Sequence, residues 1–323
     1  MITLKIKFTD FWYGFSATEN YFYRLLSSKY NLVLSERPDI LIYSCYGRDY
    51  LNYKCVRIFY SAENIRPDFN ACDYAIGFDY NNDPRHYRLP LYALYIDQPG
   101  THEKLCTQLT TEESLDIWRN KKKFCCMVVS NGGSKKRINF FNTLSQYKPV
   151  DSGGKILNNV GGPVVDKMTF IKDYRFVLAF ENSSHPGYTT EKIIEPFMAD
   201  CIPVYWGDPN VTEEFNEKSF LNLKAGMSDE AFIDLIKKID ADEALAAKYL
   251  AASKFKNGEI PNAIDKEKIL RFWHAIVDSL PAKEPVAKTL KKYLHSVSLM
   301  QKSVSYQLNR MKNAFKKYSK KNP

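Results

Sequence analysis

The sequence lacks the features that define several protein classes. No apolar run approaches the ~20 residues that a membrane-spanning helix needs. The first residues, MITLKIKFTDFW, contain no apolar signal-peptide core. No CxxC, HExxH or GxGxxG motif occurs, and the five His are scattered. The sequence therefore predicts a cytoplasmic protein with no zinc site and no dinucleotide fingerprint.

Disulfide chemistry is equally poorly supported. The seven Cys are odd in number, and several lie in apolar, strand-like contexts. Reduced, buried thiols account for them better than a disulfide framework does. The 323 residues are 45% hydrophobic and 14% aromatic, which is typical of a globular protein with room for two domains.

Acidic residues are scarce in one segment only. Residues 282–323 hold eleven Lys or Arg and a single acid, a net charge of +10. The rest of the chain therefore carries −1 of the total of +9. A near-neutral body argues against a nucleic-acid-binding surface, and the sequence predicts no nucleic-acid partner.

The basic segment also carries a heptad pattern. Apolar residues recur at alternating spacings of four and three, with Gln301 as the one polar member: Leu290, Leu294, Val297, Val304, Leu308, Met311, Phe315 and Tyr318. Two interpretations stay open for residues 287–318. The heptad period favours a homodimer, and the charge favours peripheral contact with an anionic membrane. Packing on the protein's own body is the third alternative.

Residues 176–211 predict a βαβ unit around which the other segments are organised. Phe176–Phe180 and Ile202–Trp206 are short apolar runs typical of buried parallel strands, and Thr189 or Thr190 can cap the helix between them. Lys192 places a cation at the positive end of that helix, at a cost of about 0.3–1 kcal/mol. The usual compensation is an anion bound there, and ligands of open α/β sheets bind at the carboxyl ends of the strands.

Two other charged residues follow predicted strands. Glu63 comes after the apolar run at residues 55–60. Arg137 comes after the run at 124–130 and a turn rich in Gly, Asn and Lys, an arrangement that can receive phosphates. From pattern alone, a solvated loop acid and an ordinary surface cation fit these two residues equally well. Short strands spaced by helices predict an α/β protein with domains at 1–115 and 116–281, followed by the tail at 282–323.

Three segments resemble, in order, the motifs of the α1,3/4-fucosyltransferases, glycosyltransferase family ten. Residues 180–211, FENSSHPGYTTEKIIEPFMADCIPVYWGDPNV, resemble the family's donor-binding pattern F-E-N-S, Y-x-T-E-K and I-P-V-x-W-G-x-P. Residues 61–79, SAENIRPDFNACDYAIGFD, and residues 136–139, KRIN, resemble two further segments. Ala62 stands where the family usually has Gly, which leaves the shape of that loop open.

The resemblance implies a GT-B fold, with two Rossmann-like domains facing across a cleft. It implies an inverting α1,3-fucosyltransferase with GDP-β-L-fucose as donor and no required metal. The implied acceptor is the GlcNAc or Glc of Galβ1,4-GlcNAc (Lewis x type) or lactose. The matching positions assign a general base, Glu63, two cations on the diphosphate, Arg137 and Lys192, and three other donor-binding residues, Asn182, Tyr188 and Glu191.

Physical chemistry supports these roles. An inverting transfer needs a base for the acceptor hydroxyl and positive groups for the charge that develops on the leaving diphosphate. Three alternatives stay open: a dual α1,3/4 specificity, another nucleotide sugar as donor, and an inactive glycan- or nucleotide-binding module. Asp240 and Asp242 form a DxD string, which we interpret as a helix-boundary coincidence and not as a metal site.

Overall fold

The structure, a computed structural model, describes residues 2–301 and 305 and divides the chain into two compact units. Unit 1 comprises residues 1–77, 83–87 and 267–323, and unit 2 comprises residues 78–82 and 88–266. These limits differ from the predicted boundaries near 115 and 281. Residues 88–115 belong with unit 2 because their first helix packs on the helix that begins at Glu191. Residues 267–279 return to unit 1, where Trp273 packs against Phe22.

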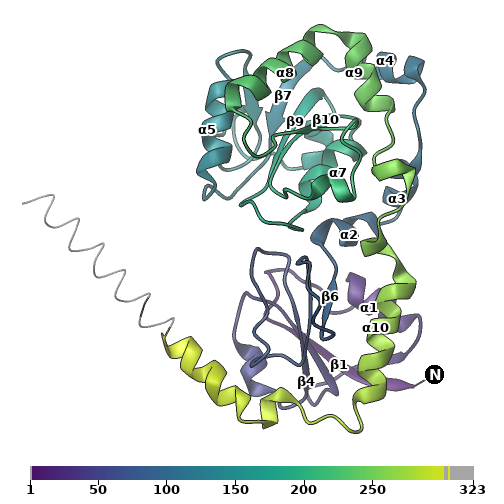
Figure 1. The fold of residues 1–323 in the computed structure, drawn as a ribbon, viewed down its shortest axis with the longest axis vertical. Coiled ribbons are helices and arrows are strands. Elements are labelled where there is room, and N and C mark those ends of the chain that lie inside the picture. Colours follow the sequence, from purple (N-terminus) through teal and green to yellow (C-terminus); the bar gives the residue numbers. More distant parts are fainter. Residues whose placement is uncertain (1, 302–304, 306–323) are drawn as a thin grey trace, which may run out of the picture. The chain divides into compact units, whose positions relative to one another are not determined.

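Unit 1 is built on a six-stranded sheet of order β2-β1-β3-β4-β5-β6 (Figure 1). The pairings β2-β1, β1-β3, β3-β4 and β4-β5 are all parallel, as the alternation of short strands and helices predicts. Its helices and strands are β1 (Thr3–Thr9), α1 (Tyr21–Ser27), β2 (Asn31–Leu34), β3 (Ile40–Tyr43), η1 (Asp49–Asn52), β4 (Val56–Tyr60), β5 (Tyr74–Gly77), β6 (His86–Arg88), α10 (Lys266–Ser279) and η5 (Val286–Lys288).

The central strands of unit 1 are buried on both faces, as their continuous apolar runs predict. All four residues of β3 and all five of β4 are buried. On one face Leu41 and Phe59 join a cluster that includes Tyr50 of η1. On the other, Tyr60 meets Phe22 of α1 at 4.9 Å between ring centroids. Helices are therefore needed on both sides of the sheet.

Unit 2 is built on a five-stranded sheet of order β11-β10-β9-β7-β8, and every neighbouring pair is parallel. Its helices and strands are α2 (Leu91–Ile96), α3 (Thr101–Cys106), α4 (Thr111–Asn120), β7 (Lys123–Met127), α5 (Lys135–Leu144), β8 (Val150–Ser152), α6 (Lys167–Ile171), β9 (Tyr174–Phe180), α7 (Glu191–Met198), β10 (Ile202–Trp206), η2 (Val211–Glu213), β11 (Leu221–Asn222), α8 (Asp229–Ala241), α9 (Glu243–Ala251), η3 (Lys256–Gly258) and η4 (Asn262–Ile264).

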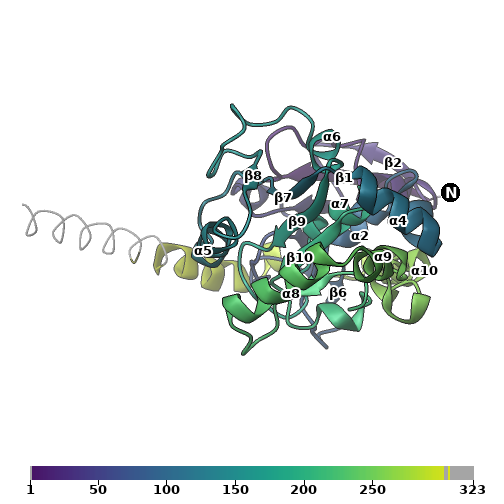
Figure 2. The same ribbon diagram turned by 90° about the horizontal axis from the view of Figure 1, so that it is seen from above.

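Alternate residues of the unit 2 strands point to two separate cores. Phe176 and Leu178 face a large cluster that is completed by α4, α5, α8 and α9. Val177, between them, faces a smaller cluster with Ile171 of α6 and Cys201. The order of β10, β9, β7 and β8 and the helices around them can be followed in Figure 2. This two-sided burial explains why residues 176–180 of β9 are all apolar.

The two acids of the DxD string have separate structural roles. The Asp240 side chain, in the last turn of α8, is 1% exposed and accepts from Tyr147 Oη at 3.1 Å and from Lys148 Nζ. Asp242 is the N-cap of α9 and accepts from the backbone N of Leu245 at 2.9 Å. Among residues 2–301 and 305, no group of three His, Cys, Asp or Glu side chains is placed to hold a metal ion.

The first part of the C-terminal segment is a helix at residues 291–301 whose contact with unit 1 does not use the heptad positions. His295 is buried; its Nε2 lies 2.7 Å from Tyr50 Oη and its Nδ1 2.7 Å from Asp68 Oδ2. The heptad residues Leu294 and Val297 stay 62% and 48% exposed. The helix therefore packs on the body through His295 and leaves the heptad face uncovered. The heptad positions Val304 to Tyr318 lie outside the described residues.

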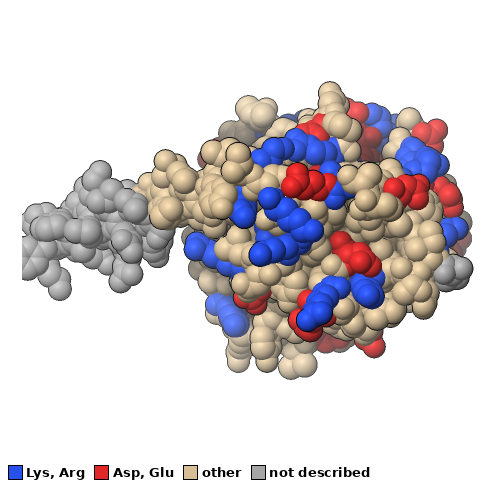
Figure 3. All heavy atoms as spheres, turned by 90° about the horizontal axis from the view of Figure 1, so that it is seen from below, with Lys and Arg blue, Asp and Glu red and all other residues tan. Residues whose placement is uncertain are grey.

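Charges on the surface are mixed. On the face drawn in Figure 3, Lys and Arg side chains are interspersed with acidic and uncharged ones. No helix among the described residues is long and apolar enough to cross a membrane.

A buried lysine closes the end of α9 and gives a prediction for pH. Burial lowers the pKa of Lys254 to about 8, and its Nζ donates to the carbonyl oxygens of Leu250 at 2.6 Å and Ala252 at 3.1 Å. Between pH 8 and 10.5 the unfolded state binds more protons at this residue, so the unfolding free energy should rise through that window, by about 3 kcal/mol at most. Lys254→Met should lack this rise.

Denaturant unfolding of the wild type and both lysine variants at pH 7.5 and 10 measures the effect. Lys248→Met, an exposed residue of the same helix, is the matched control and should follow the wild type. Equal pH dependence in wild type and Lys254→Met would contradict the assignment.

Candidate active site

The polar residues that follow β9 and β10 are buried, and Glu181 is at their centre. Glu181 comes directly after β9, and its backbone N donates to the Trp206 carbonyl oxygen of β10 at 2.8 Å. Its side chain is fully buried. Oε1 accepts from the backbone N and Oγ1 of Thr190 at 2.8 and 2.9 Å, and Oε2 accepts from Lys192 Nζ at 3.0 Å. Burial raises the pKa of Glu181.

Lys192 projects from the first turn of α7 into this group of carboxylates. Its Nζ donates to Glu181 Oε2 and Thr190 Oγ1, both at 3.0 Å, and lies 3.4 Å from Glu191 Oε1. Burial would lower the pKa of Lys192, but the charges of Glu181 and Glu191 outweigh it and raise the pKa. For Glu191 the opposing effect of burial is outweighed by Lys192 and Lys167, which lower its pKa.

The unfavourable position of Lys192 in the helix dipole is therefore compensated within the fold. The sequence favours a bound anion as the compensation, whereas the structure supplies two carboxylates of its own. The sequence could not distinguish these because Glu181 lies eleven residues away, in a stretch that resembles an ordinary polar loop.

Arg137 lies in the first turn of α5 and is 1% exposed. Its Nε and Nη2 donate to the Phe180 carbonyl oxygen at 3.1 and 2.8 Å, and Nη2 also donates to Asn182 Oδ1 at 2.8 Å. Nη1 donates to the Asn131 carbonyl oxygen at 3.1 Å. Burial lowers the pKa of this guanidinium. Four of its five N–H groups thus hold the loops after β7 and β9 in place. A side chain that only bound a phosphate at the surface would not need these hydrogen bonds, so Arg137 also has a structural role.

The loop between Asn182 and α7 is held from beneath by Asp208. Its carboxylate accepts from the backbone N of Gly187 and from Thr189 Oγ1, both at 2.8 Å. Tyr188, between them, is buried and packs on Phe78 with ring centroids 4.9 Å apart. Burial raises the pKa of Asp208. The structure thus brings together Arg137, Asn182, Tyr188, Glu191 and Lys192, all predicted from sequence, and adds Glu181 and Asp208.

The charges of this cluster nearly cancel. Arg137 and Lys192 contribute two positive charges, and the carboxylates of Glu181, Glu191 and Asp208 contribute up to three negative ones. When no ligand is bound, the carboxylates compensate the buried cations. The same cations remain available to an anion when it binds. Its cations and backbone N–H groups lie at the carboxyl edge of a parallel sheet, where ligands of such sheets bind. The residues therefore fit a phosphate-bearing ligand.

Glu63 belongs to unit 1, whereas the cluster around Glu181 belongs to unit 2. It follows β4, its backbone N donates to Ser61 Oγ at 3.0 Å, and its Oε1 accepts from Tyr46 Oη at 3.0 Å. The side chain is partly exposed. Its carboxylate is thus oriented by one hydrogen bond and still open to solvent, which suits a base that must meet a substrate hydroxyl.

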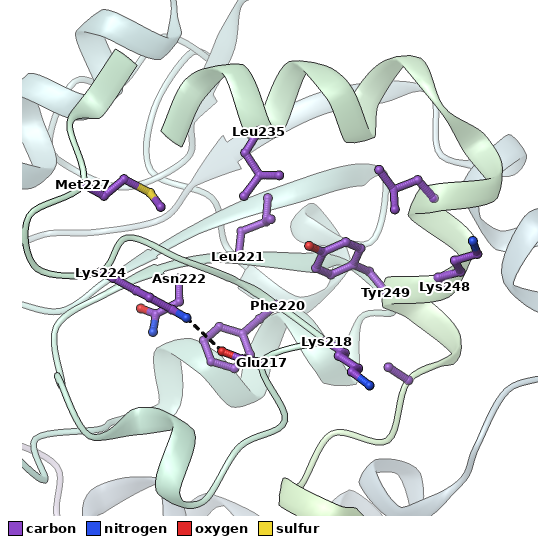
Figure 4. A pocket seen from close by; sticks show the side chains of 12 residues that line it. Glu217, Lys218, Phe220, Leu221, Asn222, Lys224, Met227, Leu235, Lys248 and Tyr249 are labelled. Carbon is purple, nitrogen blue, oxygen red and sulfur yellow. Dashed lines mark hydrogen bonds and ion pairs between the residues drawn. The ribbon is translucent and has the colours of Figure 1, made fainter. Parts of the chain in front are cut away.

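A separate pocket of unit 2 contains none of these residues (Figure 4). It has a volume of about 540 Å³ and lies between β11, α8 and α9. Apolar side chains such as Phe220, Leu235 and Tyr249 line it, with Lys218 and Lys248 also contributing. Its Lys224 Nζ lies 2.9 Å from Glu217 Oε2, but both side chains are 57% exposed, in contrast to the buried pair after β9, so we assign no catalytic role to this pocket.

Two known protein-family descriptions match successive parts of the chain. Residues 6–95 match the family described as "Alpha-(1,3)-fucosyltransferase FucT N-terminal domain". Residues 118–303 match "Glycosyltransferase family 10 (fucosyltransferase) C-term". The chain belongs to glycosyltransferase family 10. These matches confirm the resemblance of the three sequence segments to that family.

Individual relatives of this family 10 chain agree. It is 33% identical over 274 residues to the alpha-(1,3)-fucosyltransferase FucT of Helicobacter pylori. This match covers 72% of the chain and 56% of that protein. It is 34% identical over 142 residues to a putative fucosyltransferase of Acanthamoeba polyphaga mimivirus, 40% of the chain and 24% of that protein. The chain thus spans about half the length, or less, of these two relatives.

Solved structures of α1,3-fucosyltransferase share the fold. One with GDP-fucose matches with a TM-score of 0.70 and 28% identity, covering 86% of this chain and 91% of that one. Another matches with a TM-score of 0.74 and 26% identity, covering 89% and 92%. Together with the two parallel sheets, these likenesses confirm the predicted α/β, GT-B class.

A glycine keeps the Glu181 carboxylate in place and provides a test. Gly207 has φ +157°, and a Cβ there would lie 2.4 Å from Glu181 Cγ. Gly207→Ala should push Glu181 away from Lys192 and weaken GDP binding at least tenfold, as isothermal titration would show. Gly226→Ala is the control, because that residue has φ +83° but no atom within 4 Å of the new Cβ. It should cost about 1 kcal/mol of stability and leave GDP affinity unchanged. Equal GDP affinity in both variants would contradict the positioning role of Glu181.

Proposed function

We propose that this chain is an inverting α1,3-fucosyltransferase that moves L-fucose from GDP-β-L-fucose to the GlcNAc or Glc of Galβ1,4-linked acceptors. The observation that carries the proposal is the buried cluster of Lys192, Glu181 and Glu191 at the start of α7, within the family 10 match. Solved relatives described with GDP-fucose and with GDP support the choice of donor.

The donor-binding roles follow from the contacts in unit 2. Lys192 holds the diphosphate as a point charge at the helix end, and Arg137 offers its remaining N–H group from beneath. Glu191 faces the fucose and ribose, and Asn182 and Tyr188 complete the donor pocket. Such preorganised positive groups stabilise the charge that develops on GDP as it leaves. The residues of this cluster bind the donor without a metal in the proposal.

Glu63 acts as the general base of the proposed reaction. Its carboxylate takes the proton of the acceptor hydroxyl as that oxygen attacks the anomeric carbon, which inverts the configuration. Tyr46 donates to the same carboxylate and fixes its direction. The fucose–phosphate bond breaks, and its electrons leave with the diphosphate.

Transfer itself is the first test. Incubation with GDP-fucose and N-acetyllactosamine or lactose should give a fucosylated product, whose linkage analysis on type 1 and type 2 acceptors distinguishes α1,3 from dual α1,3/4 specificity. Absence of both product and GDP release would sink the proposal. Thermal shifts with GDP, UDP and CMP distinguish GDP-fucose from other nucleotide sugars, since the true donor's nucleotide stabilises most. Nucleotide or glycan binding without turnover would instead favour an inactive binding module.

Paired substitutions test the two assigned charges. Glu63→Gln should lower kcat by about 10²–10⁴-fold with GDP binding retained, because only the base is removed. Lys192→Ala should raise the KM for GDP-fucose by about 10–100-fold, because one charge-assisted contact is lost. Glu19, which is exposed, and Lys237, which is partly exposed and pairs with Asp234, serve as controls, and Glu19→Gln and Lys237→Ala should behave as wild type. Near-wild-type turnover of Glu63→Gln would make the base assignment wrong.

The tail and the cellular setting complete the proposal. The uncovered heptad residues Leu290, Leu294 and Val297 favour either a homodimer or peripheral contact with the inner face of the cytoplasmic membrane, and the basic charge favours the latter. A cytoplasmic enzyme without a nucleic-acid partner fits the mixed charges of the body. Salt-dependent DNA binding that disappears on deletion of residues 282–323 would contradict this last point.

A further inference from the structure

Three adjacent strands of unit 1 end in loops that carry aromatic and acidic side chains. The strands β1, β3 and β4 are neighbours and parallel, so their carboxyl ends share one edge of the sheet. Trp12 follows β1, Tyr46 follows β3 and Glu63 follows β4. This edge is where an open α/β sheet receives its ligand.

The three side chains form a continuous surface. The rings of Trp12 and Tyr46 meet at 82°, with centroids 6.4 Å apart, and Tyr46 Oη donates to Glu63 Oε1 at 3.0 Å. Trp12 is 39% and Tyr46 49% exposed. An aromatic corner, defined by Trp12 and Tyr46, is therefore open to solvent and in direct contact with Glu63.

The aromatic corner is supported from below. Phe15 packs against Trp12 with centroids 5.3 Å apart and stacks on Phe11 at 3.9 Å. Asp10 connects the two loops: its carbonyl oxygen accepts from the backbone N of Tyr46 at 2.9 Å, and its carboxylate accepts from the backbone N of Asp49 at 2.9 Å. The rings are thus preorganised, which reduces the entropy lost when a ligand binds them.

The chemistry beside the aromatic corner selects its ligand. The carboxylate of Glu63 disfavours an anion or a plain hydrocarbon. Aromatic faces offer apolar area with a negative quadrupole, which suits the C–H face of a neutral pyranose whose hydroxyl rim needs polar partners. We propose that Trp12 and Tyr46 are the subsite for the sugar ring next to the one that receives fucose, the galactose of a Galβ1,4 acceptor. This assignment rests on the proposed function, since it takes Glu63 as the base.

The role of this subsite can be separated from general damage by comparing two acceptors. Trp12→Ala should lower kcat/KM for N-acetyllactosamine about tenfold but leave kcat/KM for GlcNAc, which lacks galactose, and the KM for GDP-fucose within about twofold. Trp12→Phe should recover part of the loss. Tyr13→Ala is the matched control, because Tyr13 is the next residue, equally aromatic and fully exposed, and it should match the wild type.

Several outcomes would overturn the assignment. If Trp12→Ala lowers kcat/KM equally for N-acetyllactosamine and GlcNAc, Trp12 has a merely structural role. If Trp12→Ala and Tyr13→Ala lower kcat/KM for N-acetyllactosamine equally, the effect is not specific to the face of the loop that carries Trp12. If the wild type transfers no fucose, the proposed function fails, and binding still tests the subsite. N-acetyllactosamine should then change the tryptophan fluorescence of the wild type and not of Trp12→Phe; a change retained in Trp12→Phe would refute the subsite by itself.

Discussion

The ion pair between Glu181 and Lys192 is the interaction on which the loops at the carboxyl edge of the unit 2 sheet depend. It joins the end of β9 to the first turn of α7 across 3.0 Å, with the Glu181 side chain fully buried. A buried pair of this kind contributes little net stability, because two charges are taken out of water. The ion pair instead fixes the position of Lys192 at the start of a helix, where the dipole would otherwise disfavour a cation. A cation at this position can contact a phosphate.

The surrounding residues make that pair feasible. Gly207 leaves the space that Glu181 occupies, and Thr190 donates twice to its carboxylate. Arg137 closes the end of β9 through the Phe180 carbonyl oxygen, and Asp208 holds the loop that precedes α7. Loops after β7, β9 and β10 thus converge on one edge because the strands are parallel neighbours. In unit 1 the same topological rule gathers the loops that carry Trp12, Tyr46 and Glu63.

Much of this follows from the sequence, and the exceptions have physical causes. The apolar runs predict β9 and β10. The pair Thr189 and Thr190 predicts the start of α7 to within one residue, and the structure has Thr190 as the N-cap. Periodicity cannot show that Glu181 is buried, because an acidic residue after a strand resembles any exposed loop acid. Its burial depends on Lys192, eleven residues later, and that contact is visible only in the folded structure. Nor can periodicity show that α10 returns to unit 1, because an amphipathic helix fits any apolar surface of suitable width. The heptad pattern predicts the exposed face of the C-terminal helix, whereas the contact through His295 depends on Tyr50 and Asp68, far away in the chain.

The most direct test of the account is the number of protons exchanged when GDP-fucose binds. Calorimetric titration at pH 6 in buffers of different ionisation enthalpy measures it. In the proposed reaction the donor's diphosphate brings negative charge beside Glu181, whose pKa burial already raises, so binding should be accompanied by proton uptake in the wild type. Glu181→Gln should abolish that uptake, while a control substitution of the exposed Glu19 should not. Equal proton uptake in wild type and Glu181→Gln would contradict the claim that Glu181 holds Lys192 where the diphosphate is proposed to bind.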